Sequence, residues 1–131
     1  MAIVTIKNQQ SGQFIGVENN EPHFVNAPFQ WDIRGATAEQ ITQGTFEPSV
    51  ISSLEGLYWA ALPGRTGVPL LLTMEESYAS RFSPGGPVTA DGYPLYVAGA
   101  RPPSFVCVND ADSMVMLGDD ELTWAIKLSQ G

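Results

Sequence analysis

The residue types that most often perform catalysis are sparse in this chain. His23 is the only histidine and Cys107 is the only cysteine. A serine-type relay needs a histidine beside a nucleophile and an acid, and the sequence contains no G-x-S-x-G nucleophile motif. Cys107 lies in the apolar run FVCVN, where a cysteine usually behaves as a small buried hydrophobe. We therefore expect that the protein is not an enzyme and that Cys107 and His23 form no catalytic pair.

Metal and cofactor chemistry also lacks its usual signals. One histidine and one cysteine cannot supply the several ligands of a zinc site. The acidic runs at residues 110–112 and 119–121 lack the ligand spacing of a calcium-binding EF-hand loop. Asp110 and Asp112 are more typical of a hairpin turn. No glycine-rich phosphate loop follows a strand and opens a helix. We expect no cofactor and no metal.

Binding through loops is the chemistry that the sequence favours. Arg65 stands in the run PGRTGVP, in which prolines stiffen the unbound loop and lower the entropy lost on docking. Glycines on both sides let the backbone turn sharply and present the side chain. An arginine that projects from a stiff loop fits the acid-floored specificity pocket of a trypsin-like protease. The alternative is an ordinary solvated arginine in a turn.

The charge balance disfavours two classes of partner. Six basic residues stand against fourteen acidic residues, which gives a net charge of −8. Nucleic-acid binding depends mainly on cations that displace counterions, and anionic lipid surfaces also attract basic segments. We expect neither a nucleic acid nor a membrane as partner, and we interpret the acidic excess as a contribution to solubility.

Length and cysteine content point to one domain inside the cell. A chain of 131 residues is near the usual size of one domain, so we expect a single domain over residues 1–131. No apolar run approaches the roughly 18 residues of a membrane span. The first ten residues, MAIVTIKNQQ, lack the pattern of a signal peptide, and a single cysteine forms no intrachain disulfide. These features predict a cytoplasmic protein.

Short apolar runs separated by Gly, Pro, Asn and Asp predict an all-β fold. One helical turn is predicted at residues 37–43, with Gly35 and Gly44 on either side. Ten prolines argue against long helices. Twelve short strands are expected, at residues 2–7, 13–18, 23–26, 29–34, 45–52, 57–62, 68–74, 78–82, 93–98, 104–109, 113–117 and 122–128.

Aromatic residues recur with a period that suggests three internal repeats. Phe14, Tyr58 and Phe105 each open a predicted strand, and they are separated by 44 and 47 residues. Trp31, Tyr78 and Trp124 each stand in a closing strand, and they are separated by 47 and 46 residues. The repeats cover about residues 1–35, 44–83 and 91–131. We expect the closing aromatics to be equivalent core or cap residues around a pseudo-threefold axis, because a four-stranded unit is too small to hold a core alone. An ordinary β-sandwich with a fortuitous period is the alternative.

The repeat places three loops at equivalent positions, each between the second and third strands of its unit. Only the second of these loops carries a cation. The candidate site residues are Asn19 and Asn20 in the first loop, Gly64, Arg65 and Thr66 in the second, and Asn109, Asp110 and Asp112 in the third.

The opening run IVTIKNQQSGQFIGV is similar to the start of mushroom β-trefoil proteins. FQWDI and LTWAIKL resemble the Trp-bearing closing strands of this group, and GLYWAALPG resembles its second unit. The group includes cospin-type serine-protease inhibitors, mycocypins, which inhibit cysteine proteases, and ricin-B-like lectins. The resemblance implies a β-trefoil of twelve strands in three repeats, as a monomer or weak homodimer.

The resemblance also implies two functions. The cospin-type reactive residue lies in the loop that carries Asn19 and Asn20 here. That loop has no arginine, and its asparagines suit an asparagine-directed protease such as legumain, which mycocypins engage through an exposed Asn. The leading prediction is thus an inhibitor of a serine or cysteine protease. The alternative is a glycan-binding lectin that uses Asn109, Asp110 and Asp112, although Gln30 is adjacent to Trp31 rather than in a Q-x-W motif. A structural or storage domain without a ligand is the third option.

Overall fold

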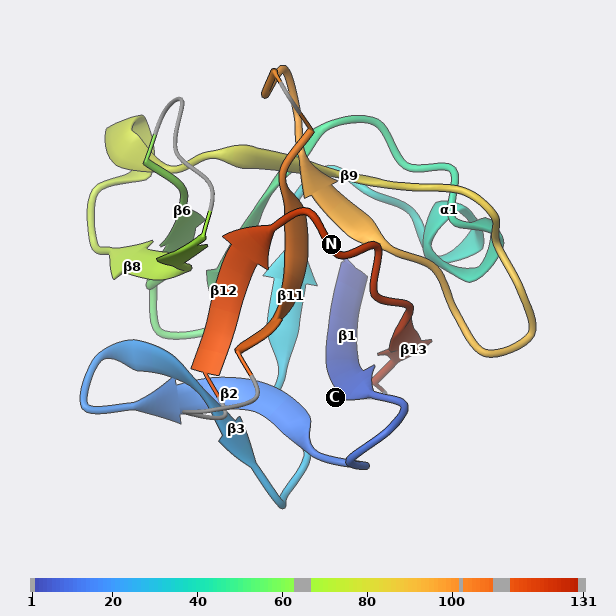
Figure 1. Cartoon of the computed structure of the whole chain (residues 1–131), viewed down its shortest axis with the longest axis horizontal. Coiled ribbons are helices and arrows are strands. Elements are labelled where there is room, and N and C mark those ends of the chain that lie inside the picture. Colours follow the sequence, from blue (N-terminus) through green and yellow to red (C-terminus); the bar gives the residue numbers. More distant parts are fainter. Residues whose placement is uncertain (1, 63–66, 102, 110–113, 130–131) are drawn as a thin grey trace.

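The computed structural model describes residues 2–62, 67–101, 103–109 and 114–129, and these form an all-β structure (Figure 1). Strands account for 49% and helices for 8%, which confirms the predicted class. The described part of the chain has thirteen strands: β1 (Ala2–Asn8), β2 (Phe14–Glu18), β3 (Glu21–Val25), β4 (Trp31–Ile33), β5 (Ser49–Ser53), β6 (Tyr58–Ala60), β7 (Val68–Pro69), β8 (Leu71–Thr73), β9 (Arg81–Pro84), β10 (Leu95–Val97), β11 (Phe105–Asn109), β12 (Met114–Gly118) and β13 (Trp124–Leu128).

The strands form an open antiparallel sheet. The order is β3-β2-β1-β4-β5-β9-β10-β11-β12-β7, while β13 pairs with β1, and β6 pairs with β5 and β8. An isolated bridge joins Tyr93, which precedes β10, to Trp124 at the start of β13. Both backbone hydrogen bonds of this bridge are made, at 3.1 Å from Tyr93 N to Trp124 O and 3.0 Å from Trp124 N to Tyr93 O. One residue pair therefore links the segment that leads into β10 to the strand that pairs with β1.

The single α-helix among the described residues lies where the sequence predicts it. Helix α1 (Ala38–Gln43) begins after Thr37, whose side chain accepts a hydrogen bond from the Gln40 backbone N–H. The Gln40 side chain in turn accepts from the Thr37 N–H, which completes a capping box. Gly44 ends the helix in the left-handed conformation, with φ of 65°. Local capping chemistry thus sets both ends of this short helix.

All twelve predicted ranges contain a strand, but one of them contains two. Residues 68–74 are split at Leu70, because β7 pairs with β12 and β8 pairs with β6. Leu70 itself is buried, and its N–H donates to the Val115 carbonyl. The predicted strand at 78–82 begins only at Arg81, because residues Glu76–Tyr78 form a 3₁₀ turn.

The three predicted repeats begin with the same local arrangement. At the end of each opening strand, a backbone N–H donates across the connection to the next strand. The three bonds run from Asn8 to Gln13 O, from Ser53 to Leu57 O and from Val97 to Ser104 O, at 2.8, 2.8 and 2.9 Å. Their donors are spaced 45 and 44 residues apart. A hairpin follows each of them, formed by β2 with β3, by β6 with β8, and by β11 with β12.

Two of the three predicted closing aromatics lie in the core. Trp31 and Trp124 are fully buried, and each indole N–H donates to a backbone carbonyl at 2.8 Å, of Ile15 and Val106 respectively. The prediction for Tyr78 was wrong, because this side chain is 73% exposed. The 3₁₀ turn carries it outward, and Phe82, four residues later, is the fully buried aromatic of this segment.

Candidate functional site

The first candidate loop is a two-residue turn at the end of the β2–β3 hairpin. Asn19 and Asn20 have φ of 54° and 61°, and both are exposed. Two consecutive left-handed residues make the turn type that matches the twist of a hairpin, and asparagine tolerates this conformation. The turn is closed by the pair Glu18–Glu21, the last of five residue pairs that join the two strands. The hairpin thus presents two amide side chains from a tightly defined tip.

Exposed apolar residues precede and follow the second candidate loop in the sequence. Gly64, Arg65 and Thr66 lie outside the described residues, between β6 and β7. The flanking strands pair Ala60 with Leu71, and Trp59 and Leu72 occupy the opposite face. Large hydrophobic side chains that are exposed to solvent recur over residues 62–78 of the sequence: Leu62, Leu71, Met74 and Tyr78. Met74 is 81% exposed, so these side chains lack the burial that apolar residues usually reach in a single folded chain.

The third candidate loop joins β11 to β12. Asn109 ends β11, is half-buried and pairs with Met114, while Asp110 and Asp112 lie outside the described residues. Trp31, the tryptophan compared above with the lectin Q-x-W motif, is fully buried and therefore cannot stack against a sugar at the surface. Its neighbour Gln30 donates to the Ser129 hydroxyl oxygen at 2.6 Å. Gln30 and Trp31 therefore serve packing and chain-end contacts rather than a sugar platform.

Arg34 and Arg81 are engaged with nearby groups. Arg34 Nη1 lies 3.1 Å from Glu76 Oε1, and its Nε lies 3.6 Å from Asp32 Oδ2. Its guanidinium carbon also lies 5.6 Å from the Tyr58 ring centroid. Arg81 donates to the Pro48 carbonyl. These ion pairs leave Arg34 less available to a partner.

Cys107 has the opposite chemistry from a catalytic thiol. Its side chain is buried on β11, and burial raises the pKa of the thiol above its ordinary value. The charges of Asp120 and Asp119 raise this pKa further, while a backbone hydrogen bond at Asp120 lowers it. His23 lies on β3 with Nδ1 3.8 Å from Glu18 Oε2. A nucleophilic cysteine needs a lowered pKa, so the thiol of Cys107 is poorly suited to that role.

Alkylation of Cys107 tests this description. Because both burial and the raised pKa reduce the thiolate fraction, iodoacetamide at pH 8 is expected to label the native protein at least about tenfold more slowly than glutathione. Mass spectrometry of timed samples measures the rate. The same protein unfolded in urea is the control and is expected to react at the rate of the small thiol. Equal rates for native and unfolded protein would contradict the burial of Cys107.

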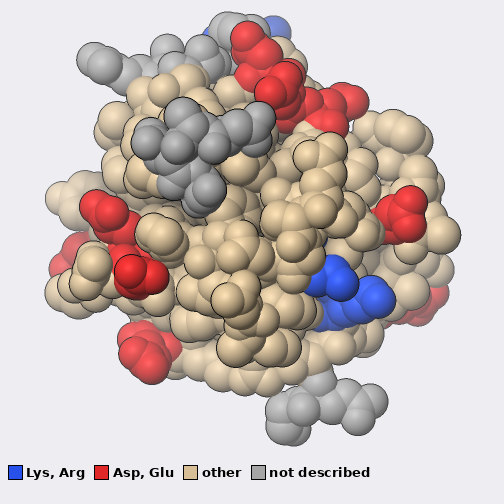
Figure 2. All heavy atoms as spheres, turned by 60° about the horizontal axis from the view of Figure 1, so that its bottom comes forward, with Lys and Arg blue, Asp and Glu red and all other residues tan. Residues whose placement is uncertain are grey.

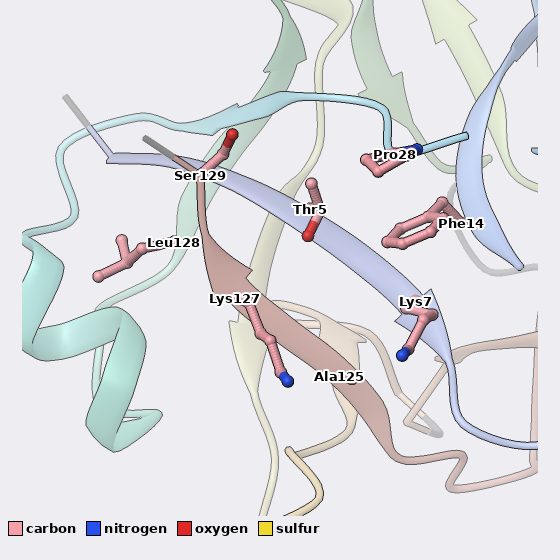
Figure 3. A pocket seen from close by; sticks show the side chains of 8 residues that line it. All are labelled: Thr5, Lys7, Phe14, Pro28, Ala125, Lys127, Leu128 and Ser129. Carbon is pink, nitrogen blue, oxygen red and sulfur yellow. The ribbon is translucent and has the colours of Figure 1, made fainter. Parts of the chain in front are cut away.

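A hollow over β1 and β13 is a feature that sequence reasoning missed. It encloses about 290 Å³ and is lined by Thr5, Lys7, Phe14, Pro28, Ala125, Lys127, Leu128 and Ser129 (Figure 3). The two strands pair Thr5 with Lys127 and Lys7 with Ala125, so these four residues share one face of the ladder. The lysines stand 120 positions apart in the sequence, and only the strand register reveals their proximity.

The described residues contain neither a cluster of side chains that could hold a metal ion nor a helix that could span a membrane. No group of three or more His, Cys, Asp or Glu side chains that could hold a metal ion occurs among residues 2–62, 67–101, 103–109 and 114–129. Within the same ranges, no helix has the length and apolar character needed to cross a bilayer. These findings concern the described residues alone.

Three comparisons with known proteins found no match for this chain. No family model, no curated protein and no solved structure matches it. The resemblance to mushroom β-trefoil proteins therefore stays a prediction that depends on the short motifs quoted above.

Proposed function

We propose that this chain is a protease inhibitor of β-trefoil fold that blocks a protease with the loop around Arg65. The fold part of the proposal is supported by the equivalent hydrogen bonds of Asn8, Ser53 and Val97 and by the hairpin that follows each one. The Tyr93–Trp124 bridge supports it further, because it connects the end of the β9–β10 ladder to the β13–β1 pair. In a β-trefoil a link of this kind closes the barrel strands into a ring, which leaves those strands without the free edges that otherwise promote aggregation.

The observation that carries the functional proposal is the exposed apolar surface beside the second loop. Leu62 follows β6 and directly precedes this loop in the sequence, Leu71 opens β8 after it, and Met74 and Tyr78 lie farther along the chain. Gathered apolar side chains on a protein surface mark protein–protein contacts, and tyrosine, methionine and arginine are enriched in such contacts. An arginine that has exposed apolar residues before and after it in the sequence has the composition of an interface anchor and its surroundings. The first and third hairpins have no comparable group of exposed large hydrophobic side chains among their described residues.

The first hairpin supports a second target class for the same scaffold. Its tip exposes Asn19 and Asn20 with no aromatic or aliphatic flank, between Glu18 and Glu21. An asparagine-directed cysteine protease reads the amide itself, so this tip is suited to such an enzyme. The two loops are on separate hairpins, which allows each to be tested without altering the other.

Replacing Arg65 by alanine is expected to weaken inhibition of trypsin by at least about 100-fold, because the guanidinium is the group that fills an acid-floored pocket. A titration of trypsin with the native protein and the variant measures the two inhibition constants. Arg101→Ala is the matched control, since Arg101 is an exposed arginine that has prolines nearby in the sequence, as Arg65 has, but lies outside the three loops. Unchanged inhibition by Arg65→Ala, or an equal loss with Arg101→Ala, would overturn the assignment of Arg65.

The variant Asn20→Gly tests whether the first hairpin inhibits an asparagine-directed protease. Glycine keeps the left-handed backbone that the turn requires while it removes the amide, so the hairpin is retained. If the first hairpin is the reactive one, this variant loses inhibition of legumain and Arg65→Ala keeps it. The lectin alternative is tested with the native protein on a glycan array, where binding competed by free sugar together with no effect on trypsin, papain or legumain would replace the inhibitor proposal.

A further inference from the structure

Lys7 and Lys127 are held near each other on the exterior of the β1–β13 ladder. Because Lys7 pairs with Ala125 and Thr5 pairs with Lys127, the two lysines are diagonal neighbours on one face. Diagonal neighbours in an antiparallel pair are about 7–8 Å apart at their backbones, which long side chains span easily. Figure 3 shows both side chains on the same side of the strands. The ladder thus directs two positive charges toward one region of space.

Neither ammonium group has a carboxylate partner within 4.0 Å in the described part of the chain, where the ion pairs involve only His23 and Arg34. Instead, Lys7 Nζ lies 6.0 Å from the centroid of the Phe14 ring. This is unusual in a protein with fourteen acidic and six basic residues. Figure 2 shows one face on which basic side chains form a compact group largely surrounded by uncharged surface. Like charges at this spacing repel one another, so an anion placed between them is stabilised by both.

The walls of the hollow are chemically mixed. Phe14, Pro28 and Leu128 supply apolar surface, and Thr5 and Ser129 supply hydroxyl groups. Ser129 Oγ accepts a hydrogen bond from Gln30, which leaves the Ser129 hydroxyl hydrogen to donate to a ligand. A volume of about 290 Å³ is at the small end of the range for ligand sites. A second hollow of about 410 Å³ adjoins it and shares Lys7, Ala125, Lys127 and Leu128.

We propose that this hollow, the Lys7–Lys127 groove, binds a small organic acid with an apolar body. The carboxylate lies between the two ammonium groups, and the apolar body lies against Phe14 and Pro28. Both parts are required, since two cations that have no carboxylate partner among the described residues favour an anion, and the apolar wall favours a ligand that covers it. This site is separate from the loop proposed to bind a protease, so the two proposals stand or fall independently.

Titration with matched probes tests the chemistry of the ligand. Octanoate is the probe, octanamide is its neutral counterpart, and inorganic phosphate is an anion without an apolar body. Calorimetry is expected to give saturable one-to-one binding of octanoate and at least tenfold weaker binding of both other probes. Backbone amide NMR shifts are expected at Thr5, Lys127 and Ser129. Equal affinity for octanamide would overturn the role of the lysines, and equal affinity for phosphate would overturn the role of the apolar wall.

Charge-removing variants locate the site. Lys7→Gln and Lys127→Gln are each expected to weaken octanoate binding about tenfold, and their combination more strongly, because each removes one of two charges that face the carboxylate. Arg101→Gln, which removes an exposed positive charge elsewhere, is the control and is expected to bind octanoate as the native protein does. Circular dichroism and thermal unfolding establish that each variant is folded. Native affinity in the double lysine variant would overturn the proposal, since Lys127 is exposed and its replacement disturbs no packed core.

Discussion

Replacing Gly92 by alanine is expected to destabilise the fold by at least about 3 kcal/mol, a large effect for one added methyl group. A Cβ at this position would lie 1.9 Å from the Trp124 carbonyl oxygen, 2.7 Å from its carbon and 3.1 Å from the Ala125 Cα. All three are backbone atoms, so no side-chain rotation relieves the clash. Gly92 also has φ of 126°, which alanine rarely adopts. The substitution separates the two backbones joined by the Tyr93–Trp124 bridge.

Gly99→Ala is the matched control for this prediction. Gly99 also has a positive φ, of 79°, but beyond its chain neighbours no atom of the described residues lies within 4 Å of the point that an alanine methyl group would occupy there, so the variant reports mainly backbone strain, about 1–2 kcal/mol. Urea denaturation followed by far-ultraviolet circular dichroism measures both free energies of unfolding. The melting temperature of Gly92→Ala is expected to fall by about 10 °C or more. Equal destabilisation of the two variants would show that the β13 backbone does not approach Gly92 in this way.

The strands and the helical turn could be predicted because their signals are local. Thr37 and Gly44 delimit α1 through contacts within a few residues, and the asparagines at positions 19 and 20 form the turn that their own backbone preferences favour. Tyr78 was placed wrongly because the period of aromatics was applied to a segment in which a 3₁₀ turn intervenes. Phe82 takes the buried position, and the period alone does not distinguish two aromatics four residues apart.

The Lys7–Lys127 groove could not be predicted, because it depends on register rather than on sequence spacing. Each lysine by itself is an unremarkable polar residue on a strand. Their shared face follows only from the pairing of the first strand with the last, and a shift of one residue in that pairing would place them on opposite faces. The exposed apolar residues that precede and follow the second loop in the sequence were missed for a related reason. Leu62 and Leu71 look like core residues in the sequence, and only their exposure in the folded chain shows otherwise.

Trp31→Phe and Trp124→Phe are each expected to destabilise the protein by about 2–3 kcal/mol, whereas Trp59→Phe is expected to cost less than about 1 kcal/mol. All three indoles are fully buried, so the loss of volume is the same. The difference lies in their N–H groups. Those of Trp31 and Trp124 donate to Ile15 and Val106, and their removal deprives a buried carbonyl of its donor. The Trp59 Nε1 has no hydrogen-bond partner in the described structure, so phenylalanine removes an unpaired buried donor.

In Trp59→Phe, the removal of the unpaired indole N–H offsets the packing that is lost because a phenyl ring is smaller than an indole. Trp59 packs edge-on against Trp31 and Phe82, each with ring centroids 5.4 Å apart, and a phenyl ring retains part of both contacts. Denaturant unfolding followed by far-ultraviolet circular dichroism compares the three variants without relying on tryptophan emission. A cost for Trp59→Phe equal to the other two would mean that its indole N–H has a partner in solution. Negligible destabilisation by Trp31→Phe and Trp124→Phe would instead show that these two hydrogen bonds contribute little. They would then no longer support the equivalence of the first and third repeats.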